Sequence, residues 1–219
     1  MNRTHPLEWI IDVLVIAFVI LFPHFAHLPY LSYTIVCFLV ILIYIRTHKK
    51  KLIDFGLKRK GLSGHAVIVG IVSAIIWMIF IKLIYFPFIN HFFKNYIQAY
   101  TEYDFVKNNI LTLLVVILAA WIGGGFYEEF VFRGFMQKVM QKWFAKYRYR
   151  FWIAGFIVSV LFGLYHWQQG IFGVIPATMG GLYWTCILKR YDGVLWYPMI
   201  SHAAYDTLAL TMLYLGILN

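Results

Sequence analysis

The sequence predicts an all-α, polytopic integral membrane protein, a helical bundle with seven to eight transmembrane helices. Of its 219 residues, 62% are hydrophobic and 13% are charged, whereas soluble domains are about half apolar and a quarter charged. Apolar runs that approach the roughly 20 residues a membrane-spanning helix needs recur along the chain. Neither an internal repeat nor a soluble domain is visible, so we expect residues 1–219 to form a single membrane domain.

Seven ranges are predicted to cross the bilayer as helices. They are Trp9–Phe22, Leu28–Ile45, Gly64–Phe86, Ile110–Met140, Phe151–Trp167, Ile171–Leu188 and Val194–Leu218. An eighth span would arise if the last range were a broken pair of helices, or if Phe88–Phe105 were re-entrant. The first range has the short apolar core of a signal peptide, but Asp12 interrupts it and no small-residue cleavage site follows. We therefore expect a retained anchor.

Basic residues concentrate in the connections on one predicted side of the membrane. They are Arg46, Lys49, Lys50, Lys51, Lys58, Arg59 and Lys60 in the second connection, Lys142, Lys146, Arg148 and Arg150 in the fourth together with Lys138 in the last turn before it, Lys189 and Arg190 in the sixth, and Arg3 before the first span. This asymmetry predicts a cytoplasmic N-terminus, and such loops attract anionic lipid headgroups. The net charge of +10 does not indicate nucleic-acid binding, because no soluble module is present to carry it.

Ionisable residues also lie within the later apolar ranges, where each charge costs about 2.5–3.5 kcal/mol. The first cluster contains Glu128, Glu129 and Arg133. Adjacent helical residues point about 100° apart, and an acid pairs well with a base four residues later. We therefore expect an ion pair between Glu129 and Arg133 that leaves Glu128 free as a general base. A purely structural ion pair between helices is the alternative.

Two further clusters follow in separate apolar ranges. Phe162 precedes His166 by four residues, and His202 precedes Asp206 by the same spacing, so each pair shares one helix face. Either pair alone is compatible with a structural role. Three ionisable clusters in three spans favour a single intramembrane hydrolytic site. Before the first cluster, the run Gly123–Gly125 predicts close helix packing or a local kink.

The ordered set E-E-x-x-x-R, F-x-x-x-H and H-x-x-x-N/D resembles the CAAX protease and bacteriocin-processing (CPBP, or Abi) family of intramembrane metalloproteases. The matching residues are Glu128, Glu129, Arg133, Phe162, His166, His202 and Asp206. The resemblance covers a protease core at about 110–218, and the three N-terminal spans at about 9–86 carry no matching motif. Asp206 stands where the prenyl-protein endopeptidases have Asn, a departure that bears on substrate choice more than on fold.

This resemblance implies an intramembrane endopeptidase that hydrolyses prenylated, leader-bearing or membrane-associated peptides. By analogy, Glu128 and His166 would activate the attacking water. An ionised Asp206 has no hydrogen to donate, so His202 is the expected donor to the oxyanion and Asp206 the group that orients it. The remaining motif residues would position the site: Glu129, Arg133 and Phe162.

A divalent metal is the cofactor that the same residues could hold. Glu128, His166 and His202 would suit zinc, since two histidines, a carboxylate and an open water position are typical of zinc hydrolases. The sequence lacks H-E-x-x-H, and a metal-free mechanism stays open.

Two other function classes fit parts of the pattern. One is a non-catalytic bacteriocin-immunity or membrane partner protein of the same family. The other is a proton- or ion-coupled transporter, which the absence of inverted repeats disfavours. The resemblance also implies residence in a bacterial plasma membrane and a peptide or membrane-protein substrate.

Overall fold

Helices account for all the regular structure in the described part of the chain. The computed structural model describes residues 6–26, 28, 32–93, 105–107 and 109–218. In chain order its longer helices are α1 (Pro6–Phe25), α2 (Ser32–Thr47), α3 (Gly64–Phe80), α4 (Phe86–Phe93), α5 (Ile110–Ala120), α6 (Gln137–Trp143), α7 (Arg150–Tyr165), α8 (Ile171–Arg190) and α9 (Trp196–Tyr214). The all-α prediction is therefore confirmed.

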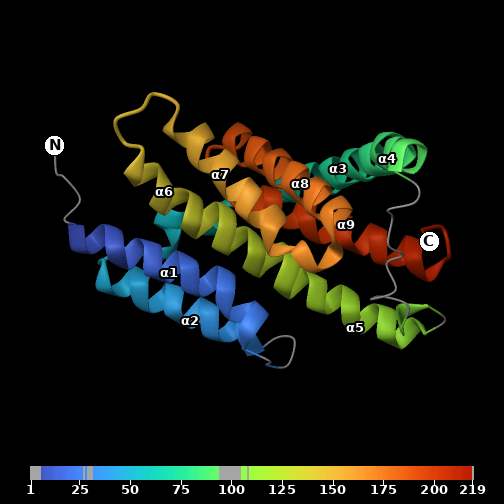
Figure 1. Ribbon diagram of the computed structural model, residues 1–219, viewed down its shortest axis with the longest axis horizontal. Coiled ribbons are helices and arrows are strands. Elements are labelled where there is room, and N and C mark those ends of the chain that lie inside the picture. Colours follow the sequence, from blue (N-terminus) through green and yellow to red (C-terminus); the bar gives the residue numbers. More distant parts are fainter. Residues whose placement is uncertain (1–5, 27, 29–31, 94–104, 108, 219) are drawn as a thin grey trace.

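Two long continuous helical rods are each built from several of these helical elements. The π-helical segment η3 (Ile81–Tyr85) joins α3 to α4, and the π-helical segments η6 (Trp121–Glu128) and η7 (Phe130–Met136) join α5 to α6. The second rod is the long green-to-yellow helix that crosses the molecule in Figure 1. π-helical turns are rare and occur frequently at functional sites, and η6 and η7 carry the residues of the first ionisable cluster or flank them.

Within the residues that the structure describes, four helical runs are long and apolar enough to cross a membrane. They are Leu7–Phe25, Gly64–Phe93, Ile110–Trp143 and Ile171–Arg190, and the shorter helices Ser32–Thr47 and Arg150–Tyr165 are also apolar. Each of the seven predicted ranges overlaps a helical run of the described residues, while their number as membrane spans stays a prediction. The last range forms one unbroken helix, α9, and not a broken pair. The re-entrant alternative at 88–105 falls largely on 94–104, outside the described residues.

Asp12, which interrupts the first apolar range, anchors α1 to the rest of the bundle. Its side chain is buried, and the Tyr44 hydroxyl donates a hydrogen bond to Oδ1. The Trp143 Nε1 donates to Oδ2 at 2.9 Å. A buried carboxylate needs such partners, and these two come from α2 and α6. The contacts make α1 part of the folded bundle, where Figure 1 shows it beside α2.

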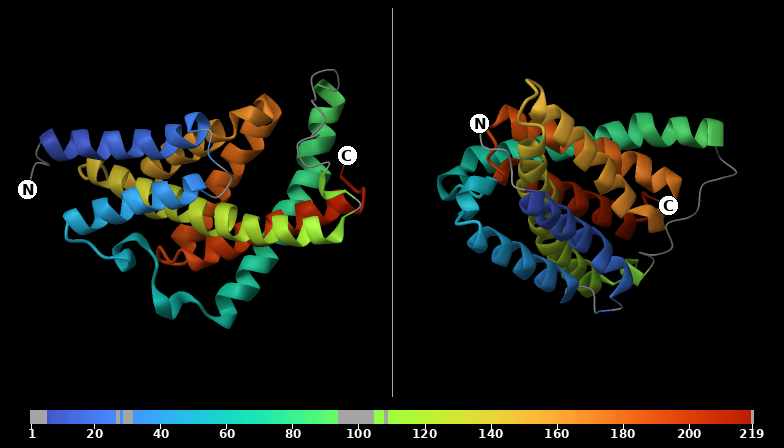
Figure 2. Two further views of the ribbon diagram at one scale, coloured as in Figure 1. Left: turned by 90° about the horizontal axis from the view of Figure 1, so that it is seen from below. Right: turned by 60° about the vertical axis from the view of Figure 1, so that its left-hand side comes forward.

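Helix α9 lies at the centre of the bundle and packs against α3, α5, α8 and η6. Its contact with α3 is close at Gly70, where an added Cβ would lie 2.5 Å from Ile200 Cγ2. Just beyond it, the hydroxyls of Ser73 and Ser201 are hydrogen-bonded at 2.9 Å. Both views of Figure 2 show the α3–α4 rod crossing behind the helices that carry the ionisable clusters. An N-terminal span without a motif thus supports the helix that carries His202.

Candidate functional site

The three ionisable clusters converge on His202 of α9. Its Nδ1 lies 2.9 Å from Oε1 of Glu129, which follows η6. The imidazole also lies edge-on to the Phe162 ring of α7, with the ring centroids 5.9 Å apart. Residues from three separate apolar ranges therefore form one site, as the sequence predicts.

The Glu129–Arg133 ion pair forms the buried floor of this site. Arg133 Nη1 lies 3.2 Å from Glu129 Oε1, and both side chains are fully buried. The guanidinium carbon is 4.2 Å from the Phe162 ring centroid and 5.4 Å from that of Trp184. Such cation–π contacts stabilise a desolvated guanidinium by about 2 kcal/mol or more. The expected ion pair is thus present, and Glu129 serves His202 at the same time.

His202 lies between two carboxylates. Glu129 accepts a hydrogen bond from the His202 Nδ1. The Asp206 Oδ2 is 3.7 Å from the His202 Nε2, beyond hydrogen-bond distance. Glu129 is therefore the carboxylate that is hydrogen-bonded to the ring, and the expectation that Asp206 orients His202 stays a prediction. The link between Glu129 and His202 joins two helices far apart in the sequence, so helical spacing could not predict it.

His166 lies at the end of α7 and is partly accessible. Its Nδ1 lies 2.8 Å from the Phe162 carbonyl oxygen, which can only accept a hydrogen bond. With the hydrogen on Nδ1, the neutral ring has a lone pair on Nε2. The Phe162 ring packs beside the imidazole, with centroids 4.7 Å apart. This contact agrees with the expected positioning role of Phe162.

Glu128 differs from Glu129 in having a free carboxylate. Among the described residues it has no hydrogen-bond or ion-pair partner, and it is only half-buried. Its carboxylate is close enough to His202 and Asp206 to interact electrostatically with both. His166 lies within reach of His202 as well. Three of the ionisable groups remain partly accessible: Glu128, His166 and Asp206. The residues beneath them are buried, and we call these the supporting layer: Glu129, Arg133 and His202.

Trp184 of α8 belongs to this supporting layer, although no sequence motif indicates it. Its indole stacks on the His202 imidazole, with centroids 3.9 Å apart and an interplanar angle of 20°. Its Nε1 donates a hydrogen bond to Ser201 Oγ at 3.2 Å. A single tryptophan in an apolar helix looks like any other core residue in the sequence. Only the fold reveals that it covers one face of His202.

The glycine run of η6 lets this rod approach α9 at the site. A Cβ on Gly124 would lie 2.5 Å from Asp206 Oδ2, and one on Gly125 would lie 2.6 Å from the Ala203 Cβ. A Cβ on Gly123 would meet nothing within 4 Å. The predicted close packing is thus confirmed for Gly124 and Gly125. Only Gly124 faces an ionisable group of the site.

The expected metal-ligand set is not assembled. Within the described residues, no group of three or more His, Cys, Asp or Glu side chains has an arrangement that could hold a metal ion. Of the expected ligands, His202 directs Nδ1 to Glu129 and His166 directs Nδ1 to a carbonyl. Their Nε2 atoms, Glu128 and Asp206 are the groups left for chemistry.

The site lies within the segment that a comparison with protein families matches. The family model described as type II CAAX prenyl endopeptidase Rce1-like matches residues 110–208, the segment that contains every motif residue. No curated protein and no solved structure matches the chain. The apolar helices and the matched family together identify an integral membrane protein. Over residues 110–208, the chain is therefore similar to the CAAX protease and bacteriocin-processing (CPBP, Abi) family, of which the matched model is a part.

Proposed function

We propose that this protein is an intramembrane endopeptidase in which Glu128 and His166 activate a water molecule. The observation that carries the proposal is the arrangement around His202. Glu128, His166 and Asp206 are partly accessible acid–base groups near His202. The buried ion pair with Arg133 holds Glu129, which is hydrogen-bonded to His202. Buried support for a few exposed reactive groups is typical of catalytic sites, because it fixes their geometry before substrate binds.

The first step is the activation of water. Glu128 accepts one proton from the water, and the Nε2 lone pair of His166 accepts a hydrogen bond from the second. The oxygen attacks the carbonyl carbon of the scissile peptide bond and forms a tetrahedral oxyanion. When this intermediate collapses, the C–N bond breaks and Glu128 returns the proton to the leaving nitrogen. Atoms and charge balance without a co-reactant other than water.

His202 is the donor to the oxyanion in this mechanism. Its Nδ1 is engaged with Glu129, so donation from Nε2 requires the imidazolium form, which has a hydrogen on each nitrogen. Glu129 on one side and Asp206 on the other would pair with that positive charge. Removal of one oxyanion donor typically lowers the rate by about 10²–10³-fold.

The expected substrates are peptides that reach the site within or beside the membrane. The matched family indicates prenylated peptides, and leader-bearing and membrane-associated peptides are the wider class we propose. We place the N-terminus in the cytoplasm of a bacterial cell, on the basis of the basic connections and the family resemblance. None of these steps depends on a bound metal, and zinc dependence is a separate proposal that the following experiment also tests.

The test is cleavage of a panel of prenylated and leader-type peptides by the purified protein in nanodiscs. The wild type and His166→Ala would be compared, each with and without a chelator. We expect cleavage by the wild type and its loss in His166→Ala, with both proteins monodisperse and equally resistant to heat. Loss of wild-type cleavage in the chelator, restored by zinc, would establish metal dependence.

Two results would contradict the proposal. Cleavage retained in His166→Ala would remove that residue from the mechanism. Failure of the folded wild type to cleave any peptide, combined with peptide binding, would favour the non-catalytic partner or immunity function instead. Peptide-independent ion flux in proteoliposomes would favour transport.

The glycine run provides a graded test of the site. Gly124→Ala is expected to lower cleavage by about 10²-fold, because its Cβ displaces the Asp206 carboxylate. Gly125→Ala should lower the unfolding free energy by about 1–3 kcal/mol, since its Cβ meets Ala203 and backbone. Gly123→Ala is the matched control and should change neither quantity. Thermal unfolding and kcat on one peptide check all three variants, and equal activity in Gly123→Ala and Gly124→Ala would contradict the expected geometry.

Trp184 is expected to position His202 without contacting the substrate. Trp184→Leu removes both the stacking and the Ser201 hydrogen bond, so kcat should fall by about tenfold or more with little change in KM. Trp184→Phe keeps an aromatic face and should recover most of the loss. A fall in stability with unchanged kcat in the folded fraction would make the role of Trp184 purely structural.

A further inference from the structure

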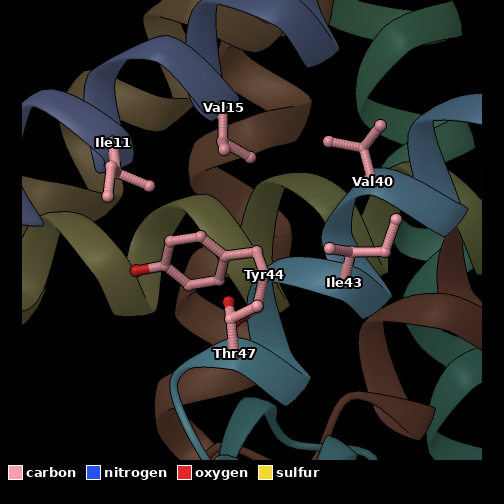
Figure 3. Close-up of a pocket in the computed structure, with 6 residues that line it drawn as sticks. All are labelled: Ile11, Val15, Val40, Ile43, Tyr44 and Thr47. Atoms are coloured by element: carbon pink, nitrogen blue, oxygen red, sulfur yellow. The ribbon is translucent and has the colours of Figure 1, made fainter.

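A second feature, remote from His202, is an apolar groove between α1 and α2. Its cavity has a volume of about 190 Å³. The lining residues are Ile11, Val15, Val40, Ile43, Tyr44 and Thr47. Figure 3 shows the α1 and α2 side chains facing each other across this space.

The polar atoms at one end of the groove are already satisfied within the protein. The Tyr44 hydroxyl donates to Asp12 and the Thr47 hydroxyl donates to the Tyr44 carbonyl oxygen at 2.9 Å. An occupant therefore gains no hydrogen bond from these donors, and the groove suits an apolar chain. The volume accommodates a short segment of an acyl chain.

The charge at the Thr47 end of the groove is positive. Four exposed cations lie next to Thr47 or within the four residues that follow it. They are Arg46, Lys49, Lys50 and Lys51. None of them forms an ion pair with another described residue. Lys142 adds a fifth cation, with Nζ 5.9 Å from the Tyr44 ring centroid. On α1 at this end, Glu8 is exposed and Asp12 is held by Tyr44 and Trp143.

We propose that this groove and the adjoining lysines form a binding site for one anionic phospholipid. One acyl chain lies between α1 and α2, and the phosphate headgroup contacts the basic end of α2. The lined stretch from Val40 to Thr47 is about 10 Å long at helical rise, so the chain enters beside Thr47 and extends toward Val40. An isolated basic loop would attract any anionic surface, whereas the groove adds selectivity for a molecule with both a chain and a headgroup.

The experiment measures lipid retained by the purified full-length protein in native mass spectrometry. The probes are phosphatidylglycerol and phosphatidylcholine with identical acyl chains. We expect the wild type to retain phosphatidylglycerol, and the variant Lys49→Gln/Lys50→Gln/Lys51→Gln to lose at least about tenfold in affinity. The matched control Lys146→Gln/Arg148→Gln/Arg150→Gln removes the same charge from another connection and should retain the lipid.

A second pair of variants tests the groove itself. Val15→Phe fills the space and should weaken phosphatidylglycerol retention, whereas Leu14→Phe, on the exposed neighbouring position, should not. If Val15→Phe does not fold, Ile43→Trp provides the same test from α2, at a side chain that is 61% exposed. Equal losses in the two charge-removing triple variants, equal retention of the two lipids, or unchanged retention in the groove-filling variants would each overturn the proposal.

Discussion

Replacing Glu128 by glutamine is expected to lower peptide cleavage by about 10²–10⁴-fold and to leave the fold intact. Glutamine keeps the shape of the side chain but cannot take a proton from water. Since Glu128 has no hydrogen-bond or ion-pair partner among the described residues, the substitution breaks no structural interaction. The measurement is kcat/KM on one peptide, with the melting temperature as the check on folding.

A matched control is available at Glu8, which is exposed on α1. Glu8→Gln removes the same charge and should leave cleavage unchanged. Glu128→Asp keeps the carboxylate but shortens its reach, so its activity should lie between those of the wild type and Glu128→Gln. Full activity in Glu128→Gln would show that another group removes the proton from water.

The largest effect on stability is expected at the buried ion pair. Arg133→Met leaves the Glu129 carboxylate without its cation in a fully buried position, which should cost about 3–5 kcal/mol. For a chain of this size that loss corresponds to a melting temperature lower by about 6–20 °C. Arg133→Lys should recover little, because a lysine ammonium lacks the planar face that packs on Phe162 and Trp184.

The double variant Glu129→Gln/Arg133→Met separates the pair from its surroundings. It removes both charges, so it should be more stable than Arg133→Met alone. Thermal unfolding of the wild type, Glu129→Gln, Arg133→Met and the double variant completes the double-mutant cycle. Strictly additive losses would mean that the two side chains do not interact, contrary to their 3.2 Å separation. Cleavage should be lost wherever Glu129 is replaced, because His202 then loses its carboxylate partner.

Contacts within one helix were predictable from the sequence. The Glu129–Arg133 pair and the Phe162–His166 contact follow from four-residue spacing, and the apolar ranges locate the helices. The role of Asp12 was less visible, because its partners Tyr44 and Trp143 come from two other helices. The sequence shows only that a carboxylate interrupts an apolar range.

Contacts between helices were not predictable in the same way. Glu129 and Trp184 both contact His202 from other segments, and helical periodicity says nothing about which faces meet. For this reason the hydrogen bond between Glu129 and His202 was not among the expectations. The three-ligand metal set stays a prediction, because residue types compatible with zinc do not fix the distances between them, and the described residues hold no group of three or more such side chains placed to bind a metal ion.

The contact between α3 and α9 has a consequence for recognising inactive relatives. Gly70 lies against Ile200, and Ser73 is bonded to the residue that precedes His202, although neither belongs to the segment that the family model matches. A larger side chain at position 70 would push α9 aside with every motif residue still in place. Pseudoenzymes could therefore evolve from such a chain without any change in the signature by which the family is detected.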